Sequence, residues 1–283
     1  MANTGYASAL GAGTIINAIA TWKGSAFGID LKTRANVRFT NNNKISGTIK
    51  GGGNPYLIKR CVRLVFKKFN YQGGFAVTTS SEIPIASGLK SSSAAANAAT
   101  LAALDALGKS MEPLEVARIG VQAALDANVT ITGAFDDASA SMLGGVVITD
   151  NRSHTLIKRE EIESEVIIYS PNIKAYSSRT DVGRSRLIAP WVDMAYELAI
   201  RGEYRKAMTL NGFLYSSALG FNSEPILMAL ELGIGGVSLS GTGPAYTALV
   251  DGEKGDRLVD AWSSLDGKII RTKVNNTGAQ IGR

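Results

Sequence analysis

The sequence predicts an α+β protein. Strand-like and helix-like segments are mixed along the chain, without the regular strand–helix alternation of a doubly wound parallel sheet. Its 283 residues, of which 45% are hydrophobic and 19% charged, are enough for one or two domains with sizeable cores. The polar stretch 150–165 is the best candidate for a junction, so we expect domains over residues 1–155 and 156–283.

The first strands are expected near the N-terminus. Residues 5–19 are small and apolar, and residues 27–39 alternate in part between polar and apolar side chains, as a half-buried strand does. The asparagine run 41–43 indicates a turn. Residues 44–50 are therefore expected to return as the second strand of a hairpin.

Helices are expected to dominate the next segment. Apolar residues at helical spacing over 56–69 predict an amphipathic helix, which a strand over 73–80 follows. Residues 91–107 (SSSAAANAATLAALDAL) are alanine-rich and strongly helix-forming, and Gly108 is a natural stop. Residues 113–127 carry a proline in the first turn of another helix.

The remaining elements follow from the same periodicities, and the tail from Asn275 is expected to be loose. Helices are predicted over 136–142, 189–201, 204–219, 224–232 and 256–265. Strands are predicted over 146–149, 166–170, 236–240, 245–250 and 268–274.

Composition excludes several classes of protein. The single cysteine, Cys61, cannot form an internal disulfide, so a disulfide-stapled scaffold is excluded. One histidine and one cysteine cannot supply a His/Cys zinc cluster. A Ser-His-Asp or Cys-His mechanism would have to use His154.

The charge and hydropathy patterns favour a cytoplasmic protein with small-molecule partners. The net charge of +6 comes from scattered residues, so a solvated basic surface explains it better than nucleic-acid binding, and small anionic ligands are compatible with it. The N-terminal residues lack the basic flank of a signal peptide, and no stretch of about 18 apolar residues suits a membrane span. Nothing in the sequence decides between a monomer and a homo-oligomer.

The strongest chemical signal lies between a predicted strand and the alanine-rich helix. A helix N-terminus presents unpaired N–H groups and a partial positive charge, which suit a phosphate, and a glycine lets the backbone approach it. A plain serine N-cap is the competing explanation, but three serines with a preceding glycine and lysine favour the phosphate. The residues concerned are Pro84, Ser87, Gly88, Leu89, Lys90, Ser91, Ser92, Ser93 and Ala94.

Two further segments are candidates for chemistry. Asp136 and Asp137 stand at the start of a predicted helix, where carboxylates either cap the helix or act on a hydroxyl or a metal. Asp126 lies upstream and is either a second metal carboxylate or a solvated helix end. A glycine-rich turn with Gly241 and Gly243 joins two apolar strands and is either an ordinary hairpin or part of a ligand site between two lobes.

Together these segments resemble the GHMP kinase superfamily, which includes galactokinase, homoserine kinase and mevalonate kinase. The motif PxxxGLGSSAA is matched by residues 84–95 with Lys90 in place of the usual glycine, and the SGxGP turn by residues 240–244. The first motif of the superfamily is matched poorly by residues 11–17. Thr14 stands where the mevalonate kinase branch has a basic residue that assists catalysis.

Within the superfamily, the chain is most similar to the archaeal-type shikimate kinases. The resemblance extends over nearly the whole chain. It depends on the strings at residues 13–21, 28–31, 46–49, 207–212 and 217–220.

This resemblance implies a ribosomal-protein-S5-like N-terminal domain, a ferredoxin-like C-terminal domain and a kinase that uses ATP and Mg²⁺. The phosphates would lie on the loop and helix start at residues 84–94, with Ser92 as a Mg²⁺ ligand. The spacing to Gly144-Gly145 matches Asp137 with the catalytic aspartate of the family and Asp126 with its second Mg²⁺ carboxylate.

The resemblance also implies an acceptor site for shikimate. Thr180 and Arg184 reproduce the Thr-xxx-Arg element of homoserine kinases, and a guanidinium suits a carboxylate. Further candidates for substrate contacts are Asn17, Asp30, Gly241 and Gly243. Phosphorylation of homoserine or a mevalonate-pathway acceptor, a non-catalytic ligand-binding role and an RNA-binding module are the alternatives.

Overall fold

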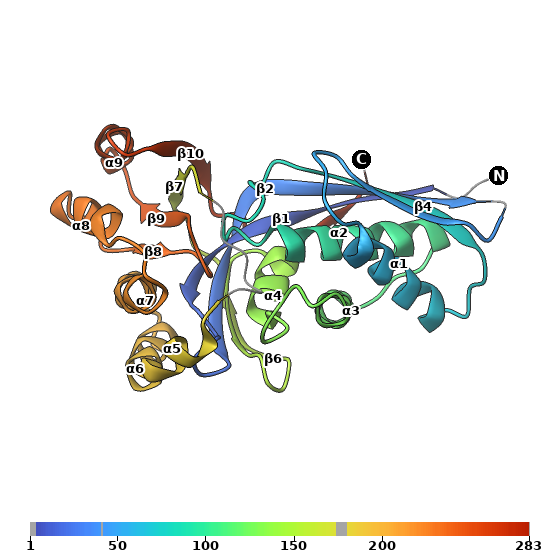
Figure 1. Cartoon of the computed structure of the whole chain (residues 1–283), viewed down its shortest axis with the longest axis horizontal. Coiled ribbons are helices and arrows are strands. Elements are labelled where there is room, and N and C mark those ends of the chain that lie inside the picture. The colour runs from blue at the N-terminus through green and yellow to red at the C-terminus, as the bar shows by residue number, and fades with distance from the viewer. Residues whose placement is uncertain (1–3, 41, 174–179, 283) are drawn as a thin grey trace.

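The computed structural model of the chain describes residues 4–40, 42–173 and 180–282, and it confirms the mixed α+β class. One sheet has the order β11-β1-β2-β4-β3, and β5 joins β2 to β6. Helices α1 to α4 lie along one face of this sheet (Figure 1). The strands are β1 (Thr4–Ile16), β2 (Lys23–Thr40), β3 (Ile45–Ile49), β4 (Gly74–Ser81), β5 (Val146–Asp150), β6 (Thr155–Glu160) and β11 (Gln280–Ile281); the helices are α1 (Tyr56–Lys68), α2 (Ser91–Leu107), α3 (Pro113–Asp126) and α4 (Phe135–Leu143).

The second sheet is antiparallel, with the order β10-β7-β9-β8. Its strands and helices follow the βαββαβ order of ferredoxin-like domains. Buried residues of both sheets share one core cluster, so the two parts pack against each other. The strands are β7 (Glu165–Pro171), β8 (Val237–Leu239), β9 (Tyr246–Val250) and β10 (Gly267–Lys273); the helices are α5 (Val182–Leu187), α6 (Ala189–Ile200), α7 (Tyr204–Leu219), α8 (Glu224–Glu231) and α9 (Lys254–Trp262).

Helix α2 is central to the first part because its small side chains let it lie directly on the sheet. Eleven of its residues are buried, most of them alanines. A Cβ at Gly5 of β1 would lie 2.1 Å from the carbonyl oxygen of Ala102, so only glycine allows this approach. The helix ends at Gly108 in the left-handed conformation, as the sequence predicts.

Two expectations about the chain path, the hairpin and the loose tail, are wrong, while the expected domains stay a prediction. Strand β3 does not return as a hairpin strand but pairs in parallel with β4, because α1 between them provides the crossover that a parallel pair requires. The polar stretch 150–165 contains β6, which belongs to the first sheet, so that sheet extends beyond the expected boundary at residue 155. The tail is ordered, since β11 pairs with β1 and Ala279 N–H donates to the carbonyl of Met142.

Among the described residues, no helix has the length and apolar character needed to cross a membrane. Helix α5 was not expected from the sequence; it is short, and the Asp181 side chain caps it by accepting from the Arg184 N–H.

Candidate active site

The loop before α2 and the glycine-rich turn after β8 lie against each other, although they are far apart in the sequence. The Ser240 hydroxyl donates to the carbonyl of Gly88 at 2.9 Å, across 152 residues of chain. The Ala245 N–H donates to the carbonyl of Ser87 at 2.9 Å, while the Ser87 hydroxyl closes the loop on Pro84. The two halves of the protein therefore meet at the two predicted ligand loops.

The N-terminal strand holds the same turn from the other side. The hydroxyl of Thr14 accepts from the Gly241 N–H at 2.8 Å, and the Asn17 amide donates to the Gly241 carbonyl at 2.8 Å. Tyr215, a buried residue of α7, donates its hydroxyl to the Asn17 carbonyl. Sequence reasoning missed Tyr215, because an aromatic residue at helical spacing looks the same whether it fills a core or anchors a loop. The side chain of Asn17 thus anchors the turn, and its predicted role in acceptor binding stays a prediction.

The start of α2 is not capped by a serine. Lys90 is the N-cap residue, no side chain caps the helix, and the first helical hydrogen bond is donated by the Ala94 N–H to the Lys90 carbonyl. The N–H groups of Ser91, Ser92 and Ser93 therefore precede the helical ladder and stay available. Ser92 is exposed and its two neighbours are half-buried. This arrangement rules out the plain serine cap and suits an anion.

Lys90 and Asp137 form an ion pair at this helix start. The Nζ of Lys90 lies 2.9 Å from Oδ1 of Asp137, and the two side chains are 9% and 15% exposed. The pair joins the N-cap residue of α2 to the first turn of α4. A lysine–aspartate pair is therefore present, even though the first motif carries Thr14 instead of a basic residue.

Asp136 has entirely different surroundings from its neighbour. It is buried, its Oδ1 accepts from the Asn151 amide at 2.7 Å, and its N–H donates to Oδ1 of Asn151 at 3.1 Å. Thr149 donates to the same Asn151 oxygen, a network that sequence reasoning did not find. Loss of solvent, together with the nearby charge of Asp137, raises the pKa of Asp136 to about 7, although Lys90 and Asn151 oppose the shift.

Replacing Asp136 by asparagine should change how stability depends on pH. Between its ordinary value of 3.8 and about 7, the carboxyl is protonated in the folded chain and ionised in the unfolded chain. Unfolding therefore releases a proton, and the stability contributed by this group is lost as pH rises through 7. Over this window, the unfolding free energy of Asp136→Asn should rise relative to that of wild type by roughly 1.4 kcal/mol per pH unit. Urea unfolding of both proteins at several pH values measures the unfolding free energy of the variant minus that of wild type. A value that stays constant or falls as pH rises over this window would contradict the prediction.

The structure does not join Asp126 to this pair. Its carboxylate lies 2.5 Å from Nε of Arg60 and accepts from the Gln122 amide at 2.8 Å. The Arg60 guanidinium, helped by Gln122, lowers the pKa of Asp126. Among the described residues, no group of three or more His, Cys, Asp or Glu side chains is placed to hold a metal. A metal role for Asp126 stays a prediction, and its carboxylate already has a structural partner.

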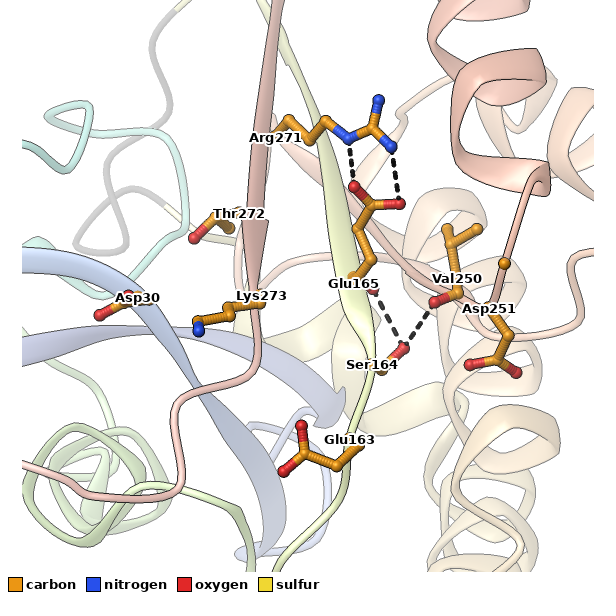
Figure 2. Close-up of a pocket in the computed structure, with 10 residues that line it drawn as sticks. Asp30, Glu163, Ser164, Glu165, Val250, Asp251, Arg271, Thr272 and Lys273 are labelled. Carbon is orange, nitrogen blue, oxygen red and sulfur yellow. Dashed lines mark hydrogen bonds and ion pairs between the residues drawn. The ribbon is translucent and has the colours of Figure 1, made fainter.

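Asp30 has partners other than Lys90 and Asp137. It pairs with Lys32 at 3.2 Å and accepts from the Asn275 amide at 2.9 Å. Figure 2 shows it at the rim of a hollow of about 650 Å³, with Glu163 and Lys273. In the same hollow, Arg271 forms a bidentate ion pair with Glu165, so these two charges neutralise each other.

The predicted acceptor element lies at the start of α5. The Arg184 N–H donates to the Asp181 side chain that caps the helix. The Arg184 guanidinium is exposed, and among the described residues it makes a long contact of 3.5 Å with the carbonyl of Ser217 on α7. Thr180 is half-buried. An exposed guanidinium is compatible with the predicted role in binding an anion, which stays a prediction.

The chain is similar to a known family and to several named proteins. Residues 56–145 match the model of the GHMP kinases N terminal domain. A protein of Methanocella arvoryzae named shikimate kinase is 61% identical, over 97% of this chain and 95% of its own length. One of Methanococcoides burtonii with the same name is 58% identical, over 98% and 99%.

Solved structures share the fold at low sequence identity. A homoserine kinase from Cytophaga hutchinsonii superimposes with a TM-score of 0.78 at 15% identity, covering 99% of this chain and 98% of its own. The mevalonate kinase of Methanococcus jannaschii superimposes with a TM-score of 0.76 at 17% identity, covering 98% of each chain.

Proposed function

Because the chain belongs to the GHMP kinase superfamily and, within it, to the archaeal shikimate kinases, we propose that it transfers the γ-phosphoryl group of ATP to a shikimate hydroxyl, forming shikimate 3-phosphate. It is a small-molecule kinase. The observation that carries the acceptor is the identity of 58–61% over nearly the whole chain with proteins named shikimate kinase. The Lys90–Asp137 pair beside an uncapped helix start supports the chemistry.

The phosphates of ATP would lie on the loop 84–90 and the first turn of α2. The N–H groups of Ser91 to Ser93 would donate to phosphate oxygens there, strengthened by the helix dipole. Gly88 and the small side chains that follow keep the backbone open to the ligand. The exposed Ser92 hydroxyl would hold Mg²⁺, which otherwise keeps water and phosphate oxygens as ligands and neutralises charge on the phosphates.

Asp137 would act on the acceptor. In an in-line transfer the shikimate hydroxyl oxygen attacks the γ-phosphorus, the bond to the β,γ-bridging oxygen breaks, and ADP leaves with the bonding pair. The hydroxyl proton passes to the Asp137 carboxylate, or Asp137 only orients the hydroxyl. The carboxylate lies at the start of α4, which faces the phosphate loop through Lys90.

Ser92→Ala should weaken the use of Mg²⁺-ATP without harming the fold. Because Ser92 is exposed and caps nothing, the change in unfolding free energy should stay within about 0.5 kcal/mol. Activity at limiting Mg²⁺ should fall, and Ser92→Thr, which keeps the hydroxyl, should restore it. A Mg²⁺ titration of the three proteins tests this, and a wild-type titration curve for the alanine variant would remove Ser92 from the site.

Arg184→Lys should raise the KM for shikimate by roughly tenfold and leave the KM for ATP nearly unchanged. A point charge replaces a planar fork, so one charge-assisted hydrogen bond to the acceptor carboxylate is lost. Arg186→Lys, another exposed arginine of the same helix, is the matched control. Equal shifts of both KM values, or equal effects at the two positions, would show that Arg184 is no dedicated acceptor residue.

An ADP-release assay with shikimate, homoserine and mevalonate tests the proposed acceptor. We expect turnover with shikimate and background rates with the other two. Preferential turnover of homoserine would move the chain to the homoserine kinase reaction on the same scaffold. ATP binding without ADP release for any acceptor would favour a non-catalytic role.

A further inference from the structure

Lys90 occupies a backbone conformation that a lysine adopts only at a cost. Its φ of +64° and ψ of +32° lie in the left-handed region, where residues other than glycine are strained. Such outliers persist when the surrounding structure enforces them, and they gather at functional sites. A glycine would satisfy this backbone without strain, so the side chain itself must be what the position requires.

The side chain of Lys90 turns toward Asp137 and the glycine-rich turn. Its Nζ is 2.9 Å from Oδ1 of Asp137, and a Cβ on Gly241 would lie 2.7 Å from the same nitrogen. The absence of a side chain at Gly241 therefore leaves room for the ammonium. The Nζ of Lys90 therefore lies next to groups from α4 and from the turn that joins β8 to β9. Lys90 itself is the N-cap residue of α2.

The ammonium of Lys90 lies beside two carboxyl groups that are adjacent in the sequence. Asp136 lies next to Asp137 in sequence, and the charges of Asp137 and Lys90 act on it in opposite directions. The Lys90 side chain is only 9% exposed, so solvent does little to screen it. Removing the ammonium would leave two neighbouring carboxyl groups without the cation, and the one that faces the loop would no longer be held in place.

We propose that Lys90 is a positioning residue of the phosphoryl transfer, whose ammonium holds the Asp137 carboxylate directed at the acceptor hydroxyl. This inference rests on the proposed kinase reaction. It differs from a direct role of the Lys90 ammonium on the phosphates, because the ammonium pairs with a carboxylate. The two roles separate kinetically, since a residue that orients Asp137 acts on kcat and a phosphate ligand acts on the KM for ATP.

Lys90→Gly and Lys90→Cys test the proposal. The glycine relieves the left-handed strain, so its melting temperature should not suffer from the backbone. Its kcat should fall by about 10²-fold or more, with the KM for ATP changed less than about threefold. The Lys90→Cys variant should be equally inactive. Alkylation of its new thiol with 2-bromoethylamine rebuilds a lysine-length ammonium as a thioether. This treatment should restore roughly a tenth or more of the wild-type kcat. The one native cysteine, Cys61, is fully buried, and treated wild type controls for it.

Each outcome decides whether Lys90 positions Asp137 or binds the ATP phosphates. A wild-type kcat in Lys90→Gly, a loss confined to the KM for ATP, or no recovery on alkylation would overturn the positioning role. The Lys90→Cys protein is the same polypeptide before and after alkylation, so this pair decides the question even if the glycine alters the loop. The assays use whichever acceptor wild type phosphorylates, so failure with shikimate alone refutes only the proposed acceptor. A wild type inactive with every acceptor overturns both proposals.

Discussion

Asp137→Asn should lower kcat by about 10² to 10⁴ and change the KM for ATP and for shikimate little. A carboxylate that accepts or orients the hydroxyl proton acts mainly in the transition state, and its removal therefore appears in kcat. Asparagine keeps the shape of the side chain but cannot accept the proton. It also leaves the Lys90 ammonium without its counter-ion, so some loss of stability is expected.

Asp136→Asn is the natural comparison for this experiment. The two carboxylates are adjacent in sequence, but Asp136 is enclosed with Asn151 whereas Asp137 faces Lys90. Steady-state kinetics of both variants, well below their melting temperatures, should show a severe defect in Asp137→Asn and a mild one in Asp136→Asn. The reverse pattern would identify Asp136 as the reacting carboxylate. Near-normal rates in both would leave catalysis to the phosphate loop and Mg²⁺.

Gly88→Ala should damage both the fold and the use of ATP. A Cβ at this position would lie 2.1 Å from the carbonyl oxygen of Ser240 and 3.1 Å from that of Gly243, and both are backbone atoms. The φ of +87° adds strain for any residue other than glycine. We expect a loss of about 2–4 kcal/mol in unfolding free energy. The KM for ATP should rise strongly, because the loop and the turn must separate.

Gly108→Ala separates the steric contact of the new Cβ from the strain of the left-handed backbone. Gly108 also has a positive φ, +62°, but open space surrounds the position of its Cβ. Its alanine variant should lose only about 1 kcal/mol, the cost of the left-handed backbone alone, and should keep its activity. Urea unfolding and ATP-dependent rates of the two variants give the comparison. Equal losses would mean that the contact between Gly88 and the turn contributes nothing.

The Gly88 prediction concerns a site to which both halves of the protein contribute. The loop before α2 belongs to the first part, and the turn between β8 and β9 to the second. Hydrogen bonds from Ser240 and Ala245 hold the turn on the loop, and Thr14 holds it from β1. A substitution that disturbs this contact from either half should therefore change the KM for ATP.

Local periodicity in the sequence was sufficient for most helices. The amphipathic pattern of α1, the alanine run of α2 and the spacing within α7 each depend on residues a few positions apart, and the structure places these helices within a residue or so of the prediction. The predicted phosphate site also comes from a local pattern, a glycine, a lysine and three serines, and the structure places that pattern at a helix start as expected.

Only the tertiary structure decided how these elements meet. The sequence could not show that β3 pairs in parallel with β4, that β11 returns to β1, or that Asp126 pairs with Arg60. It also could not distinguish Asp136 from Asp137 except through resemblance, or direct Lys90 to a carboxylate. These features depend on contacts between distant segments, and a sequence pattern holds no information on the partner of a charge until packing has brought the two together and removed water from around them.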